Sequence, residues 1–153
     1  VPEEASEAVD LLGDLYSGSK DEHVRLCAAE ALGCIRVPKS AWLLLQHLSS
    51  GAEHVGDVRA TAFYSLLRLL QACQLDTHLE SVREHAAVAQ YEDKDRYVTA
   101  YAAEVVHRID HRLLMVWEGK EPSCTRTPAL VRWCTHGNGW GSSPERQIRS
   151  KNA

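Results

Sequence analysis

The segment VRLCAAEALGCI, Val24–Ile35, decides the fold class because related segments recur twice further along the chain. It aligns without gaps with VRATAFYSLLRL from Val58 and with VTAYAAEVVHRI from Val98, so that the three starts lie 34 and 40 residues apart. Periods of this length are typical of helical arrays in which each unit stacks on the next one. The chain is therefore expected to be a repeat protein.

Each copy has an apolar stripe with the period of an α-helix. When the first Val is counted as position zero, positions 0, 4, 8 and 11 are apolar in all three copies and lie within about one quarter of a helical wheel. These residues are Val24, Ala28, Leu32 and Ile35, then Val58, Ala62, Leu66 and Leu69, then Val98, Ala102, Val106 and Ile109. A single helix cannot bury such a stripe alone, so stacked helix pairs with a continuous core are predicted.

The sequence between the copies also has helical patterns, which makes the predicted order three helix pairs. These additional helices are expected at residues 3–17, 40–48 and 76–90. Helical spacing in the first one indicates a buried face made of Ala8, Leu11, Leu12 and Leu15. Trp42 belongs to the apolar face of the second one and is predicted to lie in the core. Asp76 is the expected N-cap of the third.

The repeated pattern resembles a known family. An acidic turn followed by Val-Arg, Ala-Ala-x-Ala-Leu-Gly and Ile looks like the second helix of a HEAT repeat, in particular the short HEAT-like repeats first described in phycobilin lyase subunits. The first copy matches closely, whereas the third has Thr99 where Arg is usual. The resemblance covers roughly residues 3–110. It implies an all-α fold, a short right-handed α-solenoid of about three HEAT-like helix pairs, and it says little about activity.

The pattern is lost towards the C-terminus, which suggests two parts. Residues 1–117 are expected to form the HEAT-like helical repeat domain, and residues 118–153 an irregular, partly disordered cap or tail. Within the second part, TPALVRWC from Thr127 reads as a short helix with Pro128 at its first position. Three tryptophans lie where the repeat register is lost, and they are expected to cap the open end of the array, with incidental exposure or partner contact as the alternatives. They are Trp117, Trp133 and Trp140.

Charge and cysteine content exclude several classes of function. Residues 1–117 have 11 Lys and Arg against 18 Asp and Glu, a net charge of −7, whereas residues 118–153 have a net charge of +3. An acidic body argues against a nucleic-acid surface, including that of the HEAT-like DNA glycosylases. No apolar run is long enough to span a membrane. The cysteines number five, without a secretory pattern, so reduced thiols and a cytoplasmic location are expected.

No residue pattern predicts a metal or catalytic site. Deoxyhypusine hydroxylases, which are HEAT-repeat enzymes, bind two irons with His-Glu pairs, and the corresponding positions here hold no such pair. The reversed pairs do not share a position in the repeat and are interpreted as solvated turn and helix-surface residues. These pairs are Glu22-His23, Glu53-His54 and Glu84-His85. Cys124, Cys134 and His136 are too few and too widely spaced for a zinc site. The chain is therefore expected to be no enzyme and to bind no cofactor.

The face opposite the apolar stripe offers a candidate partner-binding surface. Positions 3, 6 and 10 of each copy form ladders across the second helices, and these ladders are rich in Tyr and Arg, which often anchor interfaces. The candidates are Glu30, Tyr64, Arg68, Tyr101, Glu104 and Arg108. A solvated polar face with Glu–Arg pairs between repeats explains the pattern equally well.

The repeat pattern and the candidate surface suggest two functions from different classes. The first is a protein–protein interaction or adaptor module with a protein partner. The alternative is a tetrapyrrole (bilin) lyase-type or chaperone-type subunit that acts on a partner protein, and it rests on the family resemblance alone.

Overall fold

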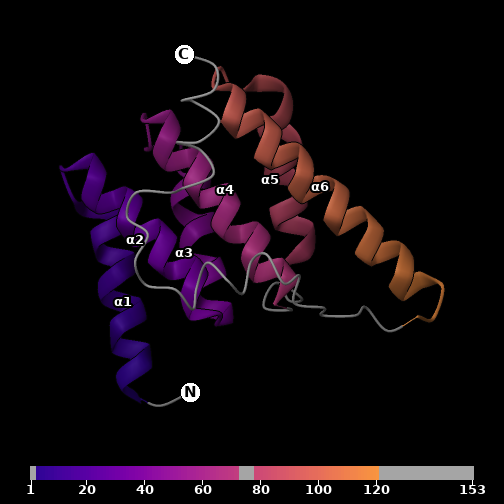
Figure 1. Ribbon diagram of the computed structural model, residues 1–153, viewed down its shortest axis with the longest axis horizontal. Helices are drawn as coiled ribbons and strands as arrows, with labels where there is room; N and C mark the ends of the chain where they lie inside the picture. The colour runs from indigo at the N-terminus through magenta and orange to yellow at the C-terminus, as the bar shows by residue number, and fades with distance from the viewer. Residues whose placement is uncertain (1–2, 73–77, 121–153) are drawn as a thin grey trace, which may run out of the picture.

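The computed structural model describes residues 3–72 and 78–120 of the 153-residue chain. Within these two ranges all of the regular secondary structure is helical and there is no strand, which confirms the predicted all-α class (Figure 1). In chain order the helices are α1 (Glu3–Gly18), α2 (Glu22–Ile35), α3 (Pro38–Ser49), α4 (Gly56–Gln71), α5 (Leu79–Glu92) and α6 (Arg96–Trp117).

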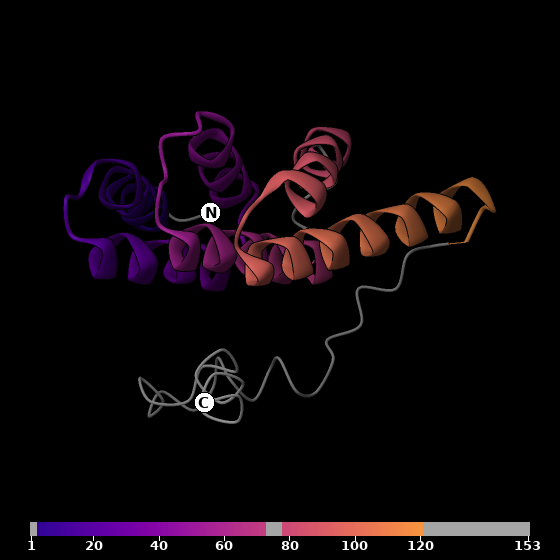
Figure 2. The same cartoon turned by 90° about the horizontal axis from the view of Figure 1, so that it is seen from above.

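The helices alternate between two layers. Figure 2 shows α1, α3 and α5 in one layer and α2, α4 and α6 in the other. The middle helix of the second layer, α4, packs against both α2 and α6, and each second-layer helix packs against the first-layer helix that precedes it. The three copies of the repeated segment are therefore neighbours in one layer.

Local chemistry explains where these helices begin and end. The carboxylate of Asp21 accepts a hydrogen bond from the His23 N–H at 2.9 Å and caps α2, and Asp95 caps α6 in the same way through the Tyr97 N–H at 2.8 Å. α2 ends at Ile35, and the residue that follows and caps it, Arg36, is left-handed with a φ of 58°. α3 begins at Pro38, two residues before the expected start at residue 40, and proline is tolerated there because the first turn of a helix needs no backbone N–H donor.

Most of the predicted apolar stripe lies in the core between the layers. Nine of its residues are buried, and they are Ala28, Leu32, Val58, Ala62, Leu66, Leu69, Val98, Ala102 and Ile109. Val24, Ile35 and Val106 are only half-buried. In α6 the residue that completes the buried face is Val105 instead of Val106, so that this helix is rotated slightly relative to the predicted register.

Two core predictions are wrong. In α1 the buried side chains belong to Val9 and Tyr16, whereas Leu11 is 62% exposed and Leu15 is 38% exposed. Both sets have helical spacing, and Gly13 lies on the buried face with Val9 and Tyr16, where the side chain of Leu43 of α3 comes close to it. Ala8, like Leu11, is exposed, and Leu12 is half-buried.

Trp42 is 48% exposed and does not lie in the core. The buried stripe of α3 consists of Ala41, Leu44, Leu45 and Leu48. Trp42 lies at the edge of that stripe, about 100° around the helix from Ala41. Its ring stands 5.7 Å from the ring of His78.

Several predictions fall outside the described residues. Asp76 is one of them, and so are all residues of the C-terminal segment beyond Lys120. That segment includes the short helix predicted from Thr127, two of the three tryptophans, and the cysteines and histidine weighed as zinc ligands, namely Trp133, Trp140, Cys124, Cys134 and His136.

Candidate functional site

Two tyrosines and an arginine of the predicted surface lie together where α4 meets α6. The ring centroids of Tyr64 on α4 and Tyr101 on α6 are 5.4 Å apart, with the ring planes inclined by 54°. The guanidinium carbon of Arg68, one turn further along α4, lies 5.8 Å from the centroid of the Tyr64 ring. Residues from two different repeats thus form one aromatic and cationic cluster, which is named the tyrosine cluster here.

The remaining candidates differ in how far they are exposed. Glu104 and Arg108 form an ion pair of 2.6 Å one turn apart on α6, with 41% and 48% of their side chains exposed. Glu30 is half-buried on α2. Arg68 itself is only 6% exposed, although its position in the repeat suggested an accessible side chain.

Close helix contacts hold the second layer together behind the cluster. α2 and α4 approach closely at Gly33, where an added Cβ would lie 2.6 Å from the Cβ of Ser65. The buried Ser65 hydroxyl donates a 2.8 Å hydrogen bond to the Ala29 carbonyl of α2. On the other side, an Arg112 guanidinium N–H of α6 donates to the Leu70 carbonyl near the end of α4 at 3.0 Å. These contacts fix the positions of the helices that carry Tyr64 and Tyr101.

An arginine network that sequence reasoning missed joins successive repeats. Arg25, at position one of the first copy, makes two hydrogen bonds to the Glu53 carboxylate, of 2.7 and 3.1 Å, and a third to the Ser19 carbonyl. Arg59, at position one of the second copy, repeats this arrangement with the Asp93 carboxylate and the Glu53 carbonyl. Each arginine therefore ties the start of one second-layer helix to the loop before the next.

The signal for this network was present in the sequence. Ser19, Glu53 and Asp93 all lie five residues before the first Val of their copy, and both arginines directly follow that Val. In the third copy Thr99 replaces the arginine, and its hydroxyl donates to the Arg96 carbonyl of its own helix. Position one of the third copy therefore cannot repeat the link to a following carboxylate.

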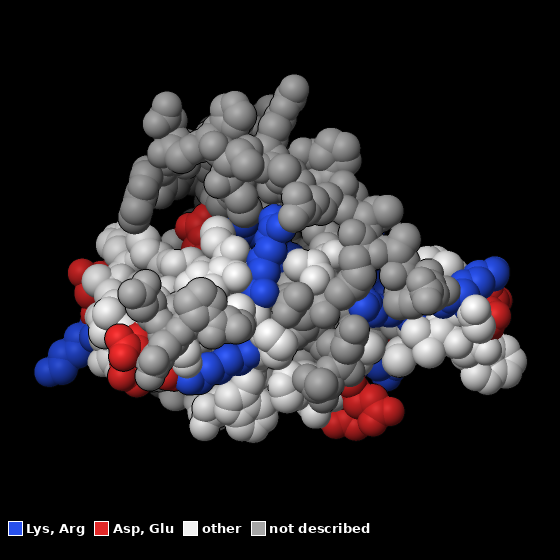
Figure 3. Space-filling view, turned by 90° about the horizontal axis from the view of Figure 1, so that it is seen from below, with Lys and Arg blue, Asp and Glu red and all other residues white. Residues whose placement is uncertain are grey.

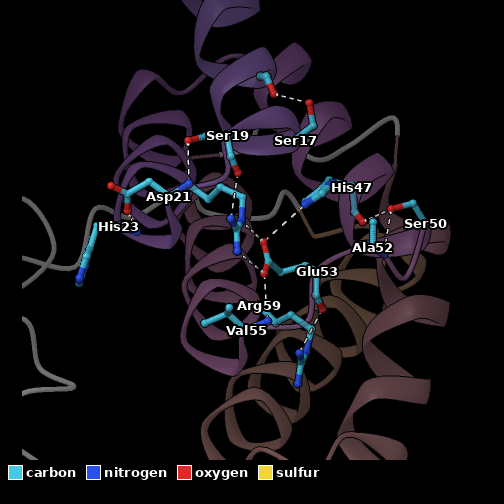
Figure 4. A network of polar contacts seen from close by, with 12 residues as sticks. Ser17, Ser19, Asp21, His23, His47, Ser50, Ala52, Glu53, Val55 and Arg59 are labelled. Carbon is cyan, nitrogen blue, oxygen red and sulfur yellow. Dashed lines mark hydrogen bonds and ion pairs between the residues drawn. The ribbon is translucent and has the colours of Figure 1, made fainter.

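Glu53 corrects the interpretation of the Glu-His pairs. It is 5% exposed, and so it is not a solvated turn residue. Figure 4 shows its carboxylate among the groups that surround it, including the Val55 N–H at 3.0 Å and the His47 ring nitrogen at 3.6 Å. Burial acts to raise the pKa of the Glu53 carboxyl, but the Arg25 guanidinium and these neighbours outweigh it and hold the pKa below the ordinary value.

The Asp93 carboxyl behaves in the same way. Burial would raise its pKa, whereas the Arg59 guanidinium and the backbone N–H of Asp95 lower it, and the lowering is the larger effect.

His85, of the third Glu-His pair, is stacked on Phe63 with ring centroids 6.2 Å apart. Burial lowers the pKa of this imidazole. Within residues 3–72 and 78–120, no three His, Cys, Asp or Glu side chains are grouped to hold a metal ion.

No protein-family model, no curated protein and no solved structure matches the chain. Among the helices that the structure describes, none is both long and apolar enough to cross a membrane.

Proposed function

We propose that this chain is a protein–protein interaction module of the adaptor type, built as a short α-solenoid of three HEAT-like helix pairs. Support for the solenoid comes from the alternation of helices between two layers and from the arginine network, which repeats at the same positions of successive copies. The HEAT-like assignment rests on the resemblance of the repeated segments.

The tyrosine cluster is the observation that supports a partner surface. Tyr64 and Tyr101 are half-buried and contact each other across two repeats, so these two side chains lose little conformational entropy when a partner covers them. The exposed Glu104–Arg108 pair beside them on α6 supplies the polar rim that interfaces usually have. Because Arg68 is 6% exposed, we assign it the role of holding the Tyr64 ring rather than of contacting the partner.

A capture experiment with a matched control tests this proposal. The chain and a Tyr64→Ala/Tyr101→Ala variant are immobilised, incubated with lysate of the source cells, and the captured proteins are quantified by mass spectrometry. The control is Tyr91→Ala, which removes a tyrosine that is 84% exposed on α5, in the other layer. We expect a partner that the chain and the control retain and the double variant loses. Equal capture by all three proteins would refute the surface.

The tetrapyrrole alternative is tested on the same material. A visible absorption spectrum of the purified chain, and of the chain after incubation with a free bilin, detects bound pigment directly. An adaptor gives no absorption band in the visible range. A band that co-purifies with the chain would replace the adaptor proposal.

A further inference from the structure

The outer side of α1 is apolar and lies at one end of the array. Figures 1 and 2 show α1 and α2 at the left-hand end of the two layers, and no described helix lies beyond them. Gly13 of α1 faces α3, where the Leu43 side chain approaches it. Leu11 and Leu15 are each two residues from Gly13, which places them about 200° around the helix. These two exposed leucines therefore point away from the array.

α2 contributes to the same outer side. Its Gly33 faces α4, and the Ala29 carbonyl accepts the hydrogen bond of the α4 residue Ser65. Ala31 lies two residues from both Ala29 and Gly33, and so it stands on the opposite side of α2 from α4. Ala31 is half-buried.

Comparison of the three copies shows what this side lacks. Positions 0, 7 and 11 are 0% exposed in the second and third copies, where the residues are Val58, Ser65 and Leu69, then Val98, Val105 and Ile109. In the first copy the same positions are only half-buried, and the residues are Val24, Ala31 and Ile35. The later copies each have a preceding helix pair among the described residues, whereas the first has none.

We name the outer surface of the first helix pair the α1–α2 end face, and it consists of Leu11, Leu15, Val24, Ala31 and Ile35. The terminal units of helical repeat arrays usually have a polar outer face, because nothing stacks on them. The α1–α2 end face is apolar instead. The first helix pair is thus built like an internal unit, with a surface suited to further helix packing.

The other side of the same pair shows how a single helix covers it. α3 packs against both α1 and α2. It places Leu43 against Gly13, and its Lys39 ammonium donates a 2.6 Å hydrogen bond to the Asp10 carboxylate of α1. One helix with an apolar stripe and a neighbouring lysine is therefore sufficient to cover one side of this pair.

The charges beside the end face are suited to a basic partner. Glu7 and Asp14 are exposed and lie one turn before and one turn after Leu11, so they border the apolar surface along α1. α1 contains no Lys or Arg. In a twofold contact between two copies of the chain the same surface meets itself, which would bring these carboxylates towards their own equivalents. A second copy is therefore disfavoured.

The basic residues of the first helix pair lie outside α1. Lys20 is in the loop between the helices, Arg36 caps the C-terminal end of α2, and Arg25 is bound to Glu53 of the next repeat. Figure 3 shows charged side chains of both signs around uncharged atoms at this left-hand end of the molecule. The acidic border along α1 is thus continuous.

We propose that the α1–α2 end face binds an amphipathic helix of a partner protein that has Lys or Arg beside its apolar stripe. The apolar stripe covers Leu11, Leu15 and Ala31, as α3 covers the other side of the pair. The basic side chains pair with Glu7 and Asp14, as Lys39 pairs with Asp10. This surface is separate from the tyrosine cluster, and the inference does not depend on the proposed function.

Fluorescence anisotropy with two synthetic peptides tests the proposal on the full chain. The basic peptide is a helix of about four turns with Leu at positions i, i+4, i+7 and i+11 and Lys on both sides of this stripe. The acidic peptide has Glu in place of each Lys. Leu11→Gln removes the most exposed side chain of the end face. Leu114→Gln makes the same change at a leucine of α6 that is 50% exposed, and it is the matched control.

The contribution of charge is tested with a second pair of variants. Glu7→Gln/Asp14→Asn removes the acidic border of the end face. Glu80→Gln/Glu84→Gln removes two exposed carboxylates of α5 and changes the net charge by the same amount. Non-specific attraction of the basic peptide to an acidic protein would weaken equally in both variants.

We expect the basic peptide to bind the unmodified chain and Leu114→Gln equally well, and Leu11→Gln about tenfold more weakly. The acidic peptide should bind more weakly than the basic one, and this preference should shrink in Glu7→Gln/Asp14→Asn but not in the α5 variant. Equal binding to Leu11→Gln and Leu114→Gln would overturn the proposal, and so would a lack of binding or of charge preference. A dimer that sedimentation velocity detects without peptide and that Leu11→Gln abolishes would assign the face to a second copy and would also overturn it.

Discussion

At the scale of single residues, Glu53 shows how a loop residue becomes part of the framework. Its side chain is 2% exposed and receives two guanidinium hydrogen bonds from Arg25, whose side chain is 15% exposed. An ionised carboxylate buried in this way is tolerated only because charged and backbone donors surround it. By contrast, the side chains of the Lys39–Asp10 ion pair are 45% and 53% exposed, and water can replace either partner.

Substituting Glu53 by Gln is therefore expected to be costly. The amide keeps the shape of the side chain but leaves the partly buried Arg25 without its counter-charge, so we expect the free energy of unfolding to fall by about 2–4 kcal/mol. Urea denaturation followed by circular dichroism measures this change. Asp10→Asn is the control, and its effect should stay within about 1 kcal/mol. Equal effects of the two substitutions would contradict the structural role of Glu53.

At the scale of helices, the contact between α2 and α4 depends on the absence of a side chain at Gly33. Gly33 lies in the last half of α2, where glycine costs helix stability, yet the Cα of Ser65 stands only 2.9 Å from the place where a Cβ would be. Backbone cannot move aside as a flexible side chain can. The close packing of α2 against α4 therefore outweighs the loss of helix stability that glycine causes in α2.

Gly33→Ala should accordingly destabilise the protein although alanine is the better helix former. We expect a loss of about 1–3 kcal/mol, since the gain in helix propensity is outweighed by the displacement of α4. Gly18→Ala is the matched control because nothing lies within 4 Å of its Cβ position, and it should be neutral or slightly stabilising. Thermal unfolding of both variants measures the difference. A Gly33→Ala variant as stable as the control would refute the close contact.

At the scale of the whole molecule, two carboxylates at equivalent positions link the three helix pairs. Glu53 joins the first copy to the second, and Asp93 joins the second to the third. Both carboxyl groups have pKa values below those of the unfolded chain, so the folded chain binds fewer protons in acid. Their contribution to stability is present above the unfolded-state pKa values of about 4.3 and 3.9 and is lost as the pH falls through the lowered folded-state values.

The free energy of unfolding should therefore decrease steeply below about pH 4–5. In a Glu53→Gln/Asp93→Asn variant this decrease should be distinctly shallower, because two of the groups that take up protons on unfolding are gone. Urea unfolding at a series of pH values between neutral and acidic conditions measures both curves. Parallel curves for the two proteins would show that these carboxylates do not govern the acid response.

The sequence by itself determined the helical class and the repeating register. Alanine at position four and branched or long aliphatic residues at positions 0, 8 and 11 recur in three copies, and this periodicity depends only on local helix geometry. It placed nine of the twelve stripe residues in the core and identified the face that holds Tyr64 and Tyr101. Both results follow because a side chain's place on a helix is fixed by its number in the sequence.

Only the tertiary structure decided which of several compatible faces is buried and which polar residues meet. Two overlapping stripes fit α1, and the buried one contains Val9 and Tyr16, on the side where Leu43 of α3 approaches Gly13. Arg25 and Glu53 are 28 residues apart in the chain, so their pairing depends on how the helix pairs stack. The burial of a residue and its partners depend on neighbours that are distant in sequence, so the repeated positions show which residues are equivalent but not which of them meet.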